Sequence, residues 1–239
     1  MLTFDTPAPI AAVLDIPAGR VRFVAGDRAD TTVEVRPADA AKRRDVQVAE
    51  RTTVDYADGV LRIEATAKHQ ILGSSGTIDV TVQLPAGSRL AIKAASADLH
   101  AAGRFGEVAY DGAYGGITLD ETTGVRLATQ AGDISVGRLD GPAQISTGKG
   151  DITIAEAVGG EVVLRTQAGD VSVGAAPGVR ASLDAGTSHG RIRNALENTG
   201  RPVGLAIQAT TGYGDIAAHT VRAGPSGTVS IRTDRRRRR

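Results

Sequence analysis

The sequence predicts an all-β protein: a β-solenoid of about seven coils of roughly 18 residues, capped by an N-terminal antiparallel β region. A motif, Thr-x-x-Gly-Asp-(Ile/Val)-x-(Val/Ile), recurs along the C-terminal two-thirds of the chain. Apolar residues alternate on both sides of its Gly, which is typical of strands with one buried face. There is no Trp, and only three Phe and four Tyr stand against 30 Gly. Such small and β-branched residues suit a narrow interior between close strands.

The first 88 residues lack the motif and are expected to form the N-terminal antiparallel region. Such a region would cover the first edge of the solenoid, because an open edge strand invites aggregation. Strands are expected at residues 21–24, 33–36, 60–64 and 78–84. The segments 38–51 and 68–76 are expected to be loops or excursions.

Residues 89–234 contain the repeats. The clearest copies are 129–136, 147–154 and 166–173, with a looser copy at 211–218 and fainter ones at 94–101, 112–119 and 187–194. The position that holds Asp in the best copies recurs at residues 98, 116, 133, 151, 170, 191 and 215, although it is Gly at 116 and Arg at 191. Identity at equivalent positions favours stacked coils over a sandwich, because stacking aligns equivalent residues in columns.

Each motif is interpreted as a corner between two short strands. The shared Gly supplies a positive φ there, and the Asp is expected to cap its own corner by accepting backbone N–H groups. At the far end the spacing lengthens, so 194–204 is expected to be a protruding loop and 228–233 a last strand. The tail at 235–239 is expected to be disordered, and the whole chain to form one continuous domain.

Net charge is +1, but the five terminal arginines hide a body of charge −4. Cysteine is absent, which excludes disulfides and thiol chemistry and fits a reducing compartment. No signal peptide and no membrane-length apolar run is recognisable. These features predict a cytoplasmic protein without a membrane span.

The sequence resembles the bacterial DUF4097 family in its actinobacterial form, a family also described as adhesin-like β-strand-repeat proteins. The resemblance rests on Leu14-Asp15-Ile16-Pro17-Ala18-Gly19, on Val33-Glu34-Val35-Arg36-Pro37 and on the repeated Thr-Gln-Ala-Gly-Asp units, and it covers nearly the whole chain. It implies a β-solenoid, and it brings no catalytic residues.

No catalytic, cofactor or metal site is predicted. One Asp per coil falls short of the 6–8 oxygen ligands of calcium. Gly186-Thr187-Ser188-His189-Gly190 matches the Gly-x-Ser-x-Gly pattern of hydrolases, but it aligns with the repeat corner and precedes a strand instead of a helix. One exposed ridge of interaction residues is predicted where the corner position holds a large side chain. Its members are Tyr114, Lys149, His189 and Tyr213.

These features predict a non-catalytic scaffold or protein-interaction module that associates with a protein partner or with itself. The alternative is a carbohydrate-binding or carbohydrate-active β-helix, adhesin-like or lyase-like. The scarcity of aromatic residues argues against this alternative. Nucleic acid or an anionic surface would be bound through the tail Arg235–Arg239. A competing anion site would use Lys149, Arg165 and Arg193 on outward positions of neighbouring coils.

Overall fold

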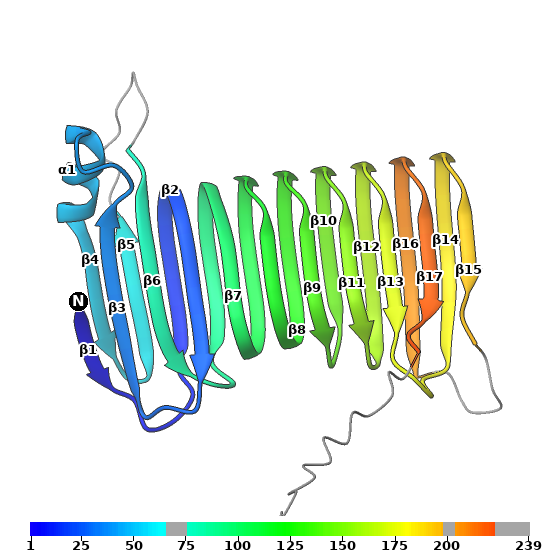
Figure 1. The fold of residues 1–239 in the computed structure, drawn as a ribbon, viewed down its shortest axis with the longest axis horizontal. Coiled ribbons are helices and arrows are strands. Elements are labelled where there is room, and N and C mark those ends of the chain that lie inside the picture. Colours follow the sequence, from blue (N-terminus) through cyan, green and yellow to red (C-terminus); the bar gives the residue numbers. More distant parts are fainter. Residues whose placement is uncertain (66–75, 198–203, 223–239) are drawn as a thin grey trace, which may run out of the picture.

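The chain winds around a narrow core as coils whose strands stack into two facing sheets (Figure 1). The computed structural model describes residues 1–65, 76–197 and 204–222. Strands β2 (Ala11–Gly26), β7 (Arg89–Tyr114) and β8 (Ile117–Ala131) bend around corners and contribute to both sheets.

The first sheet continues from these strands toward both ends. It holds β4 (Thr52–Ala57), β5 (Val60–Ala65), segments of β2, β7 and β8, then β10 (Ala143–Lys149), β12 (Gly160–Ala168), β16 (Leu205–Tyr213) and β14 (Ala181–His189). All neighbours in it are parallel except β4, which runs antiparallel to β5.

The second sheet lies opposite and follows the same order of coils. It holds β1 (Leu2–Asp5), β3 (Asp30–Pro37), β6 (Ile78–Pro85), segments of β2, β7 and β8, then β9 (Ile134–Leu139), β11 (Ile152–Ala157), β13 (Val171–Ala175), β17 (Ile216–Thr220) and β15 (Ile192–Ala195). Only β1 and β3 are antiparallel to their neighbours.

Alternate side chains of every coil fill the space between the sheets. One inward column of the second sheet is formed by Ile117, Ile134, Ile152, Val171 and Ile216, each no more than 1% exposed. Because equivalent positions stack directly upon one another, a β-branched residue in one coil packs on the same kind of residue in the next. The solenoid winding predicted from the repeat is therefore present.

The N-terminal 88 residues are not an antiparallel region throughout, which corrects the prediction. The four expected strands exist within β2, β3, β5 and β6, but β2 is parallel to β5, β6 and β7. The coil of β2 turns at Gly19, where an added Cβ would lie 2.0 Å from the carbonyl oxygen of Ile78. This corner shares the close approach of the repeats but lacks their Thr and Asp, so the motif did not reveal it.

The expected loop at 38–51 contains a helix, α1 (Arg43–Arg51), which is a second correction. Asp45 in its first turn is 5% exposed, and its Oδ1 accepts a hydrogen bond of 2.9 Å from the backbone N–H of Thr77. This bond fastens the helix to the start of β6. Sequence alternation gave no signal for so short a helix.

The coils do not follow chain order at either end. Strand β16 lies between β12 and β14, and β17 lies between β13 and β15. In Figure 1 the orange coil therefore sits inside the yellow one. Similarly β2, the first long strand, lies between the β5–β6 coil and β7. The outermost coil of the far end is thus β14–β15.

Several predicted segments fall outside the described residues. They are most of the excursion at 68–76, residues 198–203 of the expected loop, the strand at 228–233 and the tail at 235–239. Within the described ranges, no helix has the length and apolar character needed to cross a membrane.

Candidate functional site

The repeat corner is built around a column of glycines whose backbones approach one another closely. Gly132, Gly150 and Gly169 have φ values between 144° and 153°. A Cβ on each would lie 2.0–2.2 Å from the carbonyl oxygen of the glycine in the preceding coil. Both the positive φ and the contact exclude a side chain, so the predicted Gly column is structural.

The threonine of the motif is buried and ties each corner to the next coil. Thr166 Oγ1 donates to the carbonyl oxygen of Gly150 at 3.1 Å, and Thr211 Oγ1 donates to that of Gly169 at 3.0 Å. The pairing satisfies a hydroxyl that would otherwise be buried without a partner.

The aspartates form a ladder between coils instead of capping their own corners, which corrects the prediction. The Oδ1 of Asp133 accepts from the backbone N–H of Asp151 at 2.9 Å, and Asp151 accepts from Asp170 at 2.7 Å. Asp170 accepts in the same way from Asp215, and Asp215 from Arg191. The carboxylates therefore act as links along the stack, and in the described residues no cluster of His, Cys, Asp or Glu could hold a metal.

The corner position before the Gly carries the predicted ridge. Tyr114, Lys149, Tyr213 and His189 all occupy this column and all are exposed. Ala131 separates Tyr114 from Lys149, and Ala168 separates Lys149 from Tyr213. His189 and Tyr213 are neighbours, with ring centroids 4.6 Å apart and planes inclined by 8°. The structure thus aligns the four residues but brings only this pair into contact.

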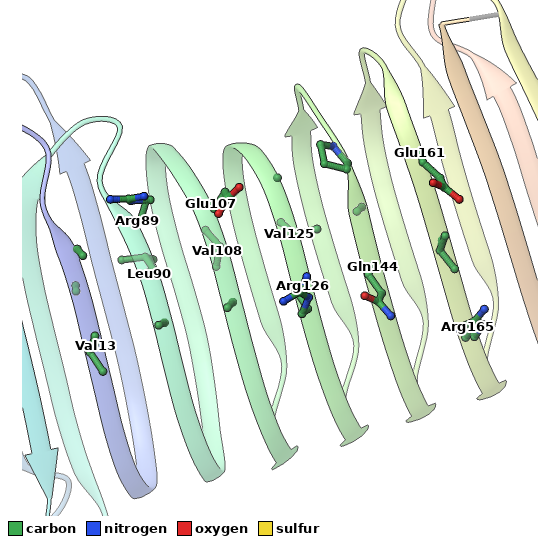
Figure 2. A pocket seen from close by; sticks show the side chains of 18 of the residues that line it. Val13, Arg89, Leu90, Glu107, Val108, Val125, Arg126, Gln144, Glu161 and Arg165 are labelled. Atoms are coloured by element: carbon green, nitrogen blue, oxygen red, sulfur yellow. The ribbon is translucent and has the colours of Figure 1, made fainter.

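The outer face of the first sheet carries a groove of about 660 Å³ that crosses the strands from β2 to β16 (Figure 2). Small residues such as Ala91, Ala109 and Gly124 leave the space open. Polar and charged side chains lie among them. These are Arg89, Glu107, Arg126, Gln144, Glu161 and Arg165, with Gln208 at the far end.

Three arginines line this groove without a carboxylate partner. Arg89, Arg126 and Arg165 are exposed, and none of them forms an ion pair with a described residue. Figure 2 shows them on a diagonal across the strands. By contrast Arg138, on the second sheet, pairs with Asp140 and Glu156. Unpaired guanidinium groups in a concave surface are available to a ligand.

The anion site suggested by sequence spacing is not assembled. Lys149 lies on the corner ridge, Arg165 lies in the groove and Arg193 lies on β15 of the opposite sheet. The hydrolase-like Gly186–Gly190 segment is likewise part of strand β14 and its corner, as its alignment with the repeats predicted. Strand β15 follows it instead of a helix.

Comparison with known families agrees with the repeat architecture. The family model Toastrack DUF4097 matches residues 13–233. The chain belongs to the Toastrack DUF4097 family.

The Toastrack chain is also similar to solved structures. One is a proposed adhesin from Bacteroides fragilis, 13% identical, with a TM-score of 0.58 over 91% of this chain and 96% of that chain. Another proposed adhesin, from Parabacteroides distasonis, is 12% identical with a TM-score of 0.44 over 90% of this chain and 95% of that chain. No curated protein matches the Toastrack chain. At these identities the likeness to the Bacteroides fragilis structure shows the fold alone.

Most of the groove in this Toastrack chain could not be predicted from the sequence. Arg89 and Arg126 lie outside the motif, at outward positions where the repeats share no residue type. Arg126 lies opposite Ala109 in the parallel register. The segment of β7 that carries Ala109 lies beside the earlier segment of β7 that begins at Arg89. Both arginines therefore lie on the same sheet, two strands apart. Only a register for the coils could have found them.

Proposed function

We propose that this protein is a non-catalytic interaction module that associates with a second copy of itself through its open end. One observation carries the proposal. Ile192 on β15 is 46% exposed, whereas its equivalents in the inner coils are no more than 1% exposed. The same apolar column therefore runs to the end of the solenoid and stops uncovered by any described residue.

The backbone of this end coil is also open. Within residues 1–65, 76–197 and 204–222, β14 pairs only with β16, and β15 pairs only with β17. A row of unpaired N–H and C=O groups on an edge strand is a template for pairing with another chain. Leu183 and Ala185 on the inner side of β14 are half-buried and would be covered by the same contact.

A single two-fold axis perpendicular to the sheets would satisfy both edges at once. It would set β14 antiparallel to the partner's β14 and β15 antiparallel to the partner's β15. At the other end of the molecule, by contrast, antiparallel strands terminate both sheets. The stacked pair His189 and Tyr213 lies on the last two coils of the ridge and would border the interface.

The predicted ridge belongs to this proposal as a further contact surface. Exposed aromatic side chains contribute large contact area at interfaces. Tyr213 is 63% exposed and Tyr114 is 57% exposed. Tyr114 and Lys149 lie farther from the open end, so they would serve a different protein partner from the one that covers β14 and β15.

The test is the mass of the full chain in solution, measured by light scattering over a concentration series. We expect a dimer that Ile192→Lys converts to a monomer, because an edge lysine opposes strand pairing. Leu2→Lys is the matched control, since Leu2 is 48% exposed but lies at the opposite end. A wild-type monomer at all concentrations would refute self-association, as would dissociation by the Leu2 variant alone.

A further inference from the structure

We infer that the groove on the first sheet binds an acidic polysaccharide, a chain of sugars that carries carboxylates at intervals. The inference concerns a different surface from the open end and does not depend on self-association. Its basis is the diagonal of Arg89, Arg126 and Arg165 along a concave surface of about 660 Å³.

The backbone positions of the three arginines are evenly spaced across the sheet. Each is carried two strands beyond the previous one in the sheet and two residues farther along the strand. Strand spacing and rise per residue then give intervals of about 12 Å between successive Cα positions. A ligand that is matched to all three must be extended and must carry negative charge at wide intervals.

Carboxylates suit these positions because a planar guanidinium binds a carboxylate through two parallel hydrogen bonds. The groove also offers uncharged hydrogen-bonding groups for hydroxyls, in Gln144 and Gln208, and Gln208 Nε2 contacts Glu161 at 3.4 Å. Glu107 and Glu161 along one side add acceptors for sugar hydroxyls. They also repel a ligand of dense negative charge.

Nucleic acid fits the groove less well. Duplex DNA carries one charge for about every 1.7 Å of its axis, far denser than the arginines. Single strands are held by aromatic platforms, and none of the described residues that line the groove is aromatic. A peptide is also disfavoured, because the backbone groups of a sheet face are already paired in the ladders and only an edge could accept a peptide as an added strand.

The probe is a fluorescently labelled polygalacturonate oligosaccharide, titrated with the full chain at low and physiological salt. We expect binding that falls at least about tenfold in the triple variant Arg89→Gln, Arg126→Gln, Arg165→Gln, because each substitution removes a charge-assisted hydrogen bond. The matched control is Arg22→Gln, Arg43→Gln, Arg104→Gln, which removes the same charge from exposed residues outside both the groove and the open end. We expect it to bind within about twofold of wild type because ligand contacts remain.

Further probes separate the remaining explanations. Replacement of Arg235–Arg239 by glutamine in the full chain removes the charge of the tail, and we expect binding to persist. Arg126→Lys keeps the charge without the planar fork, so we expect an intermediate affinity. Any of three results would overturn the inference. They are an equal loss of binding in the groove and control triple variants, a loss of binding with the tail replacement alone, and no binding at low salt. Equally tight binding of poly-glutamate would reassign the groove to acidic peptides, and a neutral pullulan should not bind.

Discussion

The two ends of the solenoid meet solvent in different ways although the coils between them are alike. At one end β3 and β4 run antiparallel to the last parallel coil, and α1 packs against this region. At the other end β14 and β15 are parallel edge strands without a further strand among the described residues. The coils between them are held by the same Thr, Gly and Asp links. The difference teaches that the repeat supplies stacking, whereas the change to antiparallel pairing at an end comes from residues outside the repeat.

The largest expected contrast is between core residues near the two ends. Phe23, in the N-terminal part of the stack, is fully buried, so Phe23→Ala should lower the free energy of unfolding by about 3–5 kcal/mol. Ile192 is half-exposed, so Ile192→Ala should cost under about 1.5 kcal/mol. Urea unfolding below the dimerisation range measures both. Equal losses would show that the open end is covered in the folded monomer.

Glycines give a second contrast, between the corner column and an open position within strand β14. Gly150→Ala should destabilise by about 2–3 kcal/mol, because the new Cβ meets a carbonyl at a positive φ. In Gly186→Ala on β14 nothing lies within 4 Å of the new Cβ, and we expect a change within about 0.5 kcal/mol. Thermal melts of the pair test the corner geometry, and an unchanged melting temperature for Gly150→Ala would contradict it.

The attachment of α1 at the N-terminal end can be loosened without changing a residue of the repeats. Asp45→Ala leaves the partly buried backbone N–H of Thr77 without its acceptor and should cost about 1–3 kcal/mol. Hydrogen exchange should then rise in α1 and at the start of β6 while β10 and β12 stay protected. A uniform rise in hydrogen exchange along the whole chain would show that α1 and the coils unfold as one unit.

The smallest expected effect concerns acid at the open end. The backbone N–H and then the guanidinium of Arg191 hold the pKa of Asp215 below its ordinary value of 3.8. A carboxyl group whose pKa is lowered on folding stabilises the folded protein at pH values above its unfolded-state pKa of about 4. This stabilisation is lost as the pH falls through the pKa of the folded state. Asp215→Asn should therefore be less stable than wild type at pH 7 and lose less stability on acidification. Unfolding curves from pH 7 to about pH 2 test this.

Asp184→Asn on the outer side of β14 is the control for that experiment. Its carboxylate does not join the ladder between coils, so its pH profile should follow the wild type. An identical change in both variants would mean that net charge, and not the ladder, sets the acid response.

The repeated part of the fold was predictable because stacking rewards the same residue in every coil. The Thr-x-x-Gly-Asp spacing located the corners and the column of corner residues that includes Tyr114 and Tyr213, and alternation located the strands. The direction of the Asp side chains was not predictable, since a corner aspartate has acceptable N–H donors both in its own turn and in the next coil. The structure selects the next coil because its backbone N–H lies 2.7–2.9 Å away.

The ends and the groove were hidden for different reasons. The coil of β2 turns at Pro17-Ala18-Gly19-Arg20, which keeps the essential Gly but not the motif. The longer spacing between Arg191 and Asp215 fits either stacking order of the last two coils. The groove depends on outward residues that vary from coil to coil, so Arg89 and Arg126 become neighbours of one surface only once the register is fixed.

The exchanged order of the terminal coils affects how this protein can fold and lengthen. Inner coils join partners 18 or 19 residues apart, but the Asp170–Asp215 link spans 45 residues. Winding in strict chain order would place β14 and β15 on β12 and β13, so we expect the docking of β16 and β17 to be a slow, long-range step. The last described coil of the chain, β16–β17, is not at the end of the stack, because β14 and β15 lie outside it. Duplication of an 18-residue unit between β8 and β13 is the change that would lengthen the array while leaving both ends intact.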